Sequence, residues 1–402
     1  MPMTQQGETR SIGGVRPETL LRVLEETSVS AFFDNWGPSD VLQVYDPETN
    51  MQGILVIDNL AMGPGVGGLR ISASTTPKEV FLRARTMTMA AALVQVDFGG
   101  AAAGIRANPA EVDKLQLVRS FAKGISPHVP DQYIATPDIG TGQEEMKAFA
   151  HEVGDLLGAT GKPAEMGGIP YELGVVGFSM GLVTETYLHS SRPWKPQPSE
   201  LTDIKVAVQG FDSTGAALVK YLAHKGATIV AISDDWGGVQ DPKGLDLAKV
   251  LKHSLAPNER QSLAHYKGST RIQADEILKV DCDVLALTTA SNLVNEQTCA
   301  SVKAKCLVEG PACPVSPVAE QLLTRQGVVV LPDLLTLGGG LVSSRCEIQR
   351  QPRERAFSTI EFKVKDAATF VFQRAAEAGL PLRRMASEVA KERILETIGG
   401  QQ

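Results

Sequence analysis

The chain has 402 residues, of which 43% are hydrophobic and 21% are charged, which is typical of a soluble globular protein with room for two domains. The net charge of -7 argues against nucleic acid or an anionic membrane as a partner. No apolar run is long enough to span a bilayer, and the N-terminus lacks the apolar core of a signal peptide, so we expect a cytoplasmic protein. The five cysteines form no CxxC pair, so we expect neither disulfides nor a metal site.

The first half of the chain predicts helices and strands separated by glycine-rich segments. Thr76, Pro77 and Glu79 read as a helix start, with a capping side chain, a proline in the first turn and an acid beside it. The other segments expected here are a helix at 17–28, strands at 41–45 and 54–57 joined by a turn at 46–50, a glycine-rich loop running into a strand at 63–70, and helices at 111–124 and 142–156.

The stretch 87–108 combines an alanine-rich helix end with small residues. We expect a helix to end at Ala90–Ala92, a short strand or turn at 93–96, and a glycine-rich loop at 99–104. Residues this small let the backbone approach a ligand or another element closely. The stretch contains no Lys, His, Cys, Ser or Tyr, so it resembles the floor of an active site without reactive groups.

The second half predicts a parallel, doubly wound sheet, because short apolar strands alternate with helices. These strands are expected at 204–209, 228–233, 284–287, 306–308 and 328–331. The tail from about residue 356 reads as two helices broken near 379–381. The expected division is a first α/β domain over 1–190, a Pro- and Ser-rich linker over 191–203, a Rossmann-type domain over 204–350 and C-terminal helices over 351–402.

A strand, the run from Gly210 to Gly215, a helix and a second strand ending at Asp234 have the arrangement of a dinucleotide-binding motif. The middle glycine of that motif is replaced by Asp212, whose charge would oppose a pyrophosphate at the helix N-terminus. Asp212 is alternatively a helix cap, and we favour that role. A bound cofactor would be NAD, weakened by Asp212, because Asp234 disfavours a 2′-phosphate. The candidate cofactor residues are Gly210, Phe211, Asp212, Ser213, Thr214, Gly215 and Asp234.

Several motifs in the right order resemble the Glu/Leu/Phe/Val (amino-acid) dehydrogenase family. They are GPxxGGLR at 63–70, MT at 87–88, GGAxxGI at 99–105, PDIGT at 137–141, TGKPAEMGG at 160–168, VQGFDSTG at 208–215, VEGPACPVSP at 308–317 and LPDLLTLGGG at 331–340. The resemblance implies an N-terminal substrate and oligomerisation domain, a Rossmann domain, and C-terminal helices that pack back toward the first domain. It also implies NAD-dependent oxidative deamination of an amino acid in the cleft between the domains.

The resemblance places the family's catalytic lysine at Ala102 and its carboxylate-binding lysine at Ala90. A third lysine, used by glutamate-specific members, falls on Val66, beside the pocket residues Gly67 and Gly68, which argues against glutamate as the substrate. Alanine offers no charge and no titrating proton, so the two lysine side chains that the family's acid–base chemistry uses are missing at these positions.

Other family positions are also replaced, since a threonine and two asparagines of the family correspond to Val176, Ala312 and Leu337. Asp138 is the retained catalytic candidate, and it either keeps that role or braces its own loop through Gly140 and Thr141. Ser344 matches a substrate contact, although a structural role is the better interpretation. Arg70 and Arg106 flank the two glycine-rich segments, where a guanidinium can hold a carboxylate, although a surface role is favoured for each.

Two hypotheses follow from these positions. The first is a divergent homologue that has lost most or all deamination activity and has a regulatory or assembly role, as a homo-oligomer or beside an active relative. The second is an active NAD-dependent dehydrogenase for an apolar amino acid, using non-standard catalytic groups. A small amino acid or 2-oxo acid is the expected ligand in either case.

Overall fold

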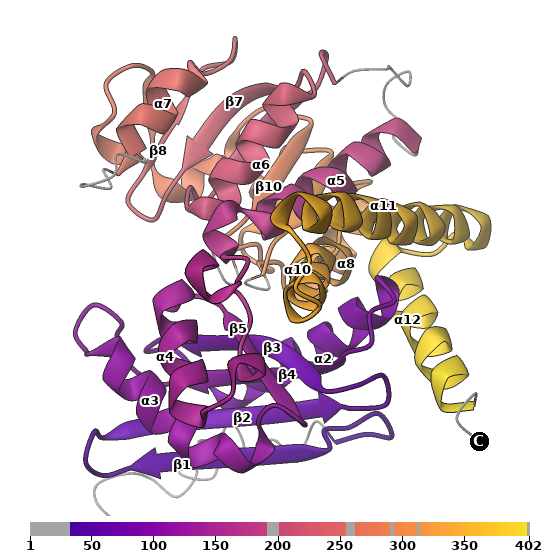
Figure 1. The fold of residues 1–402 in the computed structure, drawn as a ribbon. Coiled ribbons are helices and arrows are strands. Elements are labelled where there is room, and N and C mark those ends of the chain that lie inside the picture. Colours follow the sequence, from indigo (N-terminus) through magenta and orange to yellow (C-terminus); the bar gives the residue numbers. More distant parts are fainter. Residues whose placement is uncertain (1–32, 191–200, 255–261, 290–292, 312–313, 400–402) are drawn as a thin grey trace, which may run out of the picture.

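The computed structural model describes residues 33–190, 201–254, 262–289, 293–311 and 314–399. The chain forms two α/β lobes, each built on its own sheet, with the C-terminal helices lying beside both (Figure 1). The helix expected at 17–28, most of the expected linker, and position 312 lie outside the described residues. No helix within the described part of the chain is long and apolar enough to cross a membrane.

The first lobe is a five-stranded sheet in the order β1-β2-β4-β3-β5. Its strands are β1 (Asp40–Asp46), β2 (Met51–Asn59), β3 (Gly65–Ile71), β4 (Gly99–Ile105) and β5 (Tyr133–Pro137). The predicted hairpin is confirmed, because β1 and β2 pair antiparallel with Asp46 opposite Met51. Asn50 takes a left-handed φ of 54° in the turn, a conformation that asparagine tolerates better than most residues.

The glycine-rich segment at 99–104 lies in β4, so the prediction of a loop there is wrong. The segment at 63–70 runs into a strand as predicted, although β3 already begins at Gly65. All residues of β3 and β4 are buried, and the two strands pair in parallel. Small residues are needed because a helix lies directly on them: a Cβ at Gly100 would lie 2.2 Å from the backbone nitrogen of Thr88. The close approach predicted for this stretch is therefore with another element of the fold.

Helix α2 (Pro77–Leu93) begins as predicted, since the Thr76 hydroxyl accepts a hydrogen bond from the Glu79 backbone nitrogen at 3.2 Å. It covers one face of the first sheet, where its apolar residues meet β2 and β4. Helices α3 (Lys114–Ile125) and α4 (Gln143–Val153) cover the opposite face, and the predicted helices at these places are confirmed (Figure 1). The segment after α2 is a turn, with Gln95 at φ 50°.

The second lobe is a seven-stranded sheet in the order β12-β11-β10-β6-β7-β8-β9. Its strands are β6 (Lys205–Gln209), β7 (Thr228–Ser233), β8 (Gly238–Gln240), β9 (Thr270–Ile272), β10 (Val284–Leu287), β11 (Cys306–Glu309) and β12 (Val329–Leu331). Five strands are parallel, as predicted, whereas β8 and β9 are antiparallel. The turn from β7 to β8, in which Asp234 bonds to Gly237, is too short for the crossover that a parallel strand needs.

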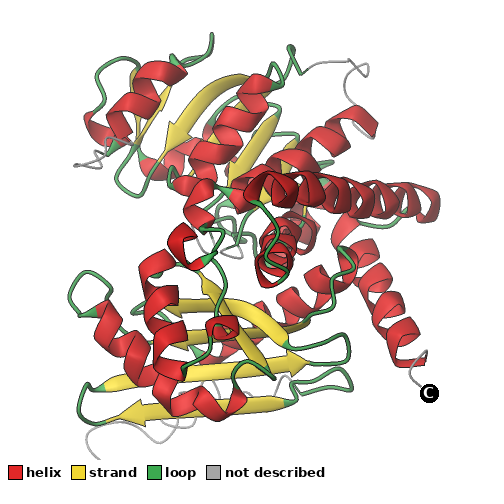
Figure 2. Cartoon of the chain, in the orientation of Figure 1, coloured by secondary structure: helices red, strands yellow, loops and turns green. Residues whose placement is uncertain are grey.

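Helices surround the second sheet and connect it to the first lobe (Figure 2). They are α5 (Val175–Ser190), α6 (Ser213–His224), α7 (Leu247–Ser254), α8 (Pro317–Arg325), α9 (Asp333–Thr336), α10 (Gly338–Ile348), α11 (Arg353–Ala378) and α12 (Leu382–Gly399). The predicted break between the last two is confirmed, because α11 ends at Gly379 with a left-handed φ of 65°.

The last two helices hold the C-terminal end of α2. Lys363 Nζ of α11 donates to the carbonyl oxygens of Val94 and Gln95 at 3.2 and 3.0 Å. Arg393 Nη1 of α12 donates to the carbonyl of Ala92 at 3.3 Å. Positive charge at a helix C-terminus is favourable, so these contacts fix α2, which carries one wall of the site, against the C-terminal helices.

Candidate functional site

A cleft of about 640 Å³ lies between the two lobes and is lined from both. The first lobe contributes residues of α2, Gly68 of β3 and the end of β5, and the second contributes the turns that follow β6 and β7. Ligands of open α/β sheets bind outside the carboxyl ends of the strands, so this cleft is the candidate site. The lining includes Gly68, Arg83, Met87, Asp138, Tyr171, Val176, Asp212, Asp234, Asp333 and Leu337.

The two positions that resemble lysine sites lie inside the apolar core. Ala90 and Ala102 are 0% exposed, and neither lines the cleft. Ala102 packs with Val80, Phe81 and Ala84 of α2, because its Cβ points to the helix side of the sheet. A lysine at either place would have to displace packed neighbours to reach the cleft.

The three predicted pocket residues on β3 are not equivalent. Val66 is fully buried in the core, and a Cβ at Gly67 would lie 1.6 Å from the carbonyl oxygen of Ala101. Gly68 lines the cleft, and a Cβ there would lie 2.6 Å from Asp138 Oδ2 and 2.9 Å from Arg83 Nη2. Gly68 thus leaves room for an ion pair at the cleft wall, while Val66 and Gly67 belong to the interior of the sheet.

Asp138 forms ion pairs with two arginines. Its carboxylate contacts Arg83 of α2 and accepts from Arg70 Nη2 at 3.2 Å, and Arg70 also pairs with Glu79. The two arginines therefore supply positive charge beside Asp138 although both positions that resemble lysine sites carry alanine. The bracing role holds as well, since the Asp138 backbone nitrogen donates to Thr141 Oγ1 at 2.9 Å.

Arg83 is the main site residue that the sequence interpretation did not identify. It lines the cleft, its side chain is 9% exposed, and its Nη2 donates to the carbonyl of Gly68 at 3.3 Å. Its spacing was the available signal: Arg83 lies seven residues before Ala90 on the same helix, which places both on one face. The surface role favoured for Arg70 is wrong, because Arg70 is buried beside the site and pairs with Glu79 and Asp138. Arg106 is exposed and absent from the cleft lining.

Ser344 is buried away from the cleft wall. Its hydroxyl lies 2.7 Å from Thr160 Oγ1 and 3.2 Å from the hydroxyl of Tyr171. Tyr171 does line the cleft and donates to the carbonyl of Gly340 at 2.9 Å. Burial raises the pKa of Tyr171 to about 12, so its hydroxyl keeps its proton at neutral pH. Ser344 lies behind Tyr171 and holds it through the contact between the two hydroxyls.

Asp212 is the N-cap of α6, which confirms the capping prediction. Its Oδ1 accepts from the backbone nitrogens of Thr214 and Gly215 at 2.9 and 3.1 Å. Gly210 takes a left-handed φ of 90°, and a Cβ at Gly215 would lie 2.1 Å from the Gly210 carbonyl oxygen. The backbone of the motif is intact, but the N–H groups that would receive a phosphate already bond to a carboxylate.

Asp234 also bonds within its own lobe. Its Oδ1 accepts from the backbone nitrogens of Trp236 and Gly237 at 3.0 and 3.1 Å and from Ser262 Oγ at 3.1 Å, and its Oδ2 accepts from the Leu263 nitrogen at 2.7 Å. Asp234 lines the cleft at the place expected for a ribose contact. It also fixes the turn from β7 to β8.

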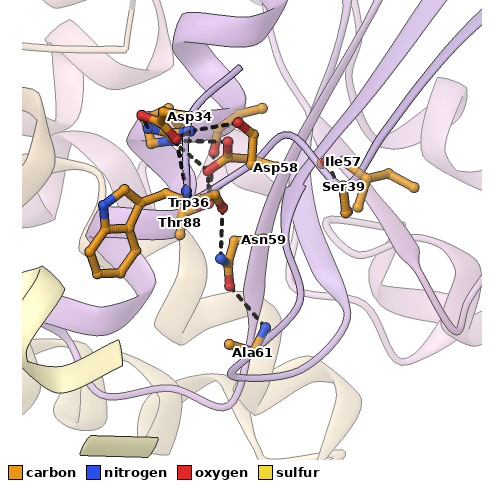
Figure 3. Close-up of polar contacts among 11 residues, drawn as sticks. Asp34, Trp36, Ser39, Ile57, Asp58, Asn59, Ala61 and Thr88 are labelled. Atoms are coloured by element: carbon orange, nitrogen blue, oxygen red, sulfur yellow. Dashed lines mark hydrogen bonds and ion pairs between the residues drawn. The ribbon is translucent and has the colours of Figure 1, made fainter. Parts of the chain in front are cut away.

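A buried polar network anchors the residues before β1 to α2 (Figure 3). Asp58 is 0% exposed, and its two oxygens accept from Arg85 Nε at 2.9 Å each and from Thr88 Oγ1 at 2.6 Å. Arg85 also binds Asp34, and Asn59 Nδ2 donates to the Trp36 carbonyl at 2.8 Å. Burial raises the pKa of Asp58, although Arg85 and Thr88 oppose the shift. Because Asp58 binds both Arg85 and Thr88 of α2, the network fixes the helix turn that ends in Ala90.

A second buried network lies under the nucleotide side of the cleft. Arg383 of α12 contacts Glu309, Glu320 at 2.6 Å and Asp333 at 2.7 Å, and Asp333 reaches the cleft. Burial raises the pKa of Glu309 to about 8. The neighbouring carboxylates of Asp333 and Glu320 act in the same direction, whereas Arg383 opposes the rise. In the part of the chain that the structure describes, no three His, Cys, Asp or Glu side chains are placed to hold a metal ion.

Comparisons with known proteins agree with this arrangement. Residues 38–154 match the model of the Glu/Leu/Phe/Val dehydrogenase dimerisation domain, and residues 167–401 match that of Glutamate/Leucine/Phenylalanine/Valine dehydrogenase. The chain belongs to the Glu/Leu/Phe/Val dehydrogenase family. It is 30% identical over 358 residues to an NADP-specific glutamate dehydrogenase of Saccharolobus shibatae, and the match covers 85% of this chain and 82% of that protein.

Solved structures of this dehydrogenase family show the same fold. A hetero-hexameric glutamate dehydrogenase from Thermus thermophilus, in a leucine-bound form, superposes with a TM-score of 0.80 at 29% identity and covers 94% of each chain. L-tryptophan dehydrogenase from Nostoc punctiforme superposes with a TM-score of 0.63 at 20% identity, covering 94% of this chain and 99% of that one. The two-domain fold expected from the sequence is thereby confirmed.

Proposed function

We propose that this family member has lost most or all oxidative deamination and acts as a regulatory or assembly subunit. The burial of Ala90 and Ala102 carries the proposal. Both positions resemble lysine sites, yet both side chains are 0% exposed and packed among apolar residues. On this proposal, the loss follows from the packing of α2 on its sheet.

The physical reason lies in which groups of the cleft lining can exchange a proton near neutral pH. Among the described residues that line the cleft there is no lysine or histidine, and an arginine stays protonated near neutral pH. Asp138 remains the catalytic candidate, but its carboxylate is held by Arg70 and Arg83, and an ion pair of this kind favours the charged form of both partners. A base so stabilised is a poor proton acceptor at neutral pH.

The proposed cofactor is NAD, bound weakly if at all. Relatives in this family are named as NADP-specific and NAD-specific glutamate dehydrogenases, which supports a nicotinamide dinucleotide. Asp212 places a negative charge at the N-terminus of α6 and uses two of its free N–H groups, so a pyrophosphate would be repelled and would lose donors. The carboxylate of Asp234 supports NAD over NADP at the ribose.

The proposed partners are other copies of this chain or an active relative. The match to a dimerisation domain supports assembly, and the similar Thermus thermophilus enzyme is a hetero-hexamer. Cytoplasmic location and a small amino acid or 2-oxo acid as ligand complete the proposal. Co-purification with an intact dehydrogenase would support the hetero-oligomer, and a homo-oligomer that ignores such a dehydrogenase would count against it.

One observation favours the alternative of an active enzyme for an apolar amino acid. Arg83 puts a cation at the cleft wall beside the retained Asp138, so a substrate carboxylate has a partner even without the two lysines. This alternative still needs a group that accepts a proton from water near neutral pH.

Turnover decides between the two proposals. The purified protein is assayed for reduction of NAD and NADP with a panel of amino acids, and for oxidation of NADH and NADPH with 2-oxo acids and ammonia. We expect no turnover above background, and NADH titration is expected to show weak binding. Rates in the ordinary enzyme range, about 1 per second or faster, would refute the loss of function.

A further inference from the structure

We infer that Arg83 has become the carboxylate-binding residue of the cleft, and that the Arg83–Asp138 pair recognises a free zwitterionic amino acid with an apolar side chain as a non-reacting ligand. The inference rests on the proposed function, because it assigns a ligand to a cleft that no longer performs the reaction. It also assigns a role to a residue that lies outside the motifs by which the chain resembles the family.

The position of Arg83 on its helix gives the first argument. Arg83, Met87 and Ala90 are spaced by four and three residues, so they follow one face of α2. Arg83 and Met87 line the cleft, whereas Ala90 is closed into the core one turn further on. Relative to the lysine that the family resemblance places at Ala90, the cation on this face lies two turns closer to the helix N-terminus. Among the described residues that line the cleft, Arg83 is the only lysine or arginine.

Charge balance gives the second argument. Arg70 and Arg83 face Glu79 and Asp138 in one connected cluster, which is two positive and two negative groups. A zwitterion adds one charge of each sign, so its carboxylate can bind Arg83 and its ammonium can bind Asp138 without leaving a charge uncompensated. A dicarboxylate would add an unbalanced negative charge to a largely buried site, at considerable cost.

Apolar residues in the cleft lining indicate which kind of side chain the ligand carries. Met87, Val176 and Leu337 line it with apolar surface, and the last two stand where the family resemblance places polar groups. Tyr171 also lines the cleft, with its hydroxyl bonded to the Gly340 carbonyl. This surface suits an aliphatic or aromatic side chain, because a polar one would be buried without partners.

Calorimetric titration of the full-length protein tests the ligand. The probes are L-valine and L-phenylalanine, and the half-ligands are 2-phenylethylamine, which lacks the carboxylate, and 3-phenylpropanoate, which lacks the ammonium. We expect an apolar amino acid to bind, and each half-ligand and L-glutamate to bind at least about tenfold more weakly, since each loses a charge-assisted contact or adds an unpaired charge. Equal binding of a half-ligand, or no binding of either amino acid, would overturn the inference.

Two variants test the residue. Arg83→Met keeps the apolar stem without the charge and should weaken amino-acid binding at least about tenfold. Arg83→Lys keeps a point charge without the forked guanidinium, so its affinity should lie between those of Arg83→Met and the unaltered protein. Arg119→Met, on the exposed face of α3, is the matched control and should bind like the unaltered protein. Unchanged affinity in both Arg83 variants refutes the role of Arg83. Should Arg83→Met fold poorly, as its melting curve would show, Arg83→Lys alone decides.

The same samples separate this inference from the proposed function. Each is assayed for reduction of NAD and NADP with the bound amino acid. Turnover together with binding that depends on Arg83 refutes the proposed loss of activity and upholds the role of Arg83. Absence of both turnover and binding leaves the proposed function standing and refutes the inference.

Discussion

On the substrate side of the cleft, formed by the first lobe, the two positions that resemble lysine sites are alanines buried in an apolar core. On the nucleotide side, formed by the second lobe, the strand–turn–helix motif keeps its backbone, and Asp212 replaces the middle glycine of the motif. Ala90 and Ala102 are each surrounded by packed side chains. Asp212, in contrast, reaches only the first backbone groups of its own helix.

This difference separates the two parts of the proposed loss of function. Packing around Ala90 and Ala102 involves α2, β2, β4 and the C-terminal helices, so one substitution cannot restore the site. The cap at Asp212 involves two hydrogen bonds within a single turn, and removing it leaves the rest of the motif unchanged. The substrate side is therefore expected to resist repair, and the nucleotide side to allow it.

Restoring lysine on the substrate side should have the largest effect on stability. Ala102→Lys places an ammonium among the packed apolar side chains of its cluster, so we expect a loss of about 4 kcal/mol or more in the free energy of unfolding. Ala90→Lys should behave similarly. Denaturant unfolding measures the loss at fixed protein concentration, with the exposed Ala110→Lys as the matched control.

The double variant Ala90→Lys, Ala102→Lys sharpens the same comparison. We expect no dehydrogenase activity, because the lysines have no open path to the cleft. A folded double variant that reduces NAD with an amino acid would show that the packing is soft and that only the lysines had been lost.

The pH dependence of stability tests the network below the nucleotide side. Burial raises the pKa of Glu309 to about 8 in the folded protein, so the folded state holds a proton that the unfolded state releases. The resulting stabilisation is fully present below the unfolded pKa of about 4.3 and is lost as the pH rises through about 8. Melting temperatures should fall over this window, and Glu309→Gln should remove most of the fall. A variant with an unchanged pH profile would assign the dependence to another group.

The sequence predicted the nucleotide side better than the substrate side for a physical reason. Strands β6 and β7 are continuous apolar runs, and the helix between them starts at a capping residue, so local chemistry determines each boundary. Strand β4 consists of glycine, alanine and one isoleucine, which lack the β-branched and aromatic residues typical of strands. Its structure depends on the neighbours that cover it, and the sequence therefore suggested a loop.

Arg83 escaped prediction for the same reason. Helix α2 was predicted, but which of its faces meets the end of β5 depends on how the helix lies across the sheet, and that is set by contacts far apart in the chain. The role of Asp138 likewise depended on Arg70 and Arg83, one from a strand and one from a helix. The motifs identified the family, while the charges of the site required the assembled fold.

Repair of the nucleotide side should be a moderate effect. Asp212→Gly removes the carboxylate and frees the N–H groups of Thr214 and Gly215, while glycine caps a helix nearly as well as aspartate. Removing a charge that opposes the phosphate at a helix N-terminus is worth about 1 kcal/mol, so NADH affinity should rise about fivefold. Fluorescence titration measures it, and Asp212→Asn, which keeps a cap without the charge, separates charge from blocked donors. No gain in either variant would mean that the nucleotide side has also changed elsewhere.

The smallest effect is expected at Ser344, where the substrate side meets α10. Ser344→Ala removes one hydroxyl, but Tyr171 keeps its bond to the Gly340 carbonyl, so the free energy of unfolding should fall by only about 1 kcal/mol. If Ser344 braces Tyr171 from behind the wall, affinity for the amino-acid ligand should change less than twofold, about 0.4 kcal/mol. A loss of binding without a loss of stability would instead make Ser344 a ligand contact, and the substrate side would then retain more of its original chemistry than the burial of Ala90 and Ala102 indicates.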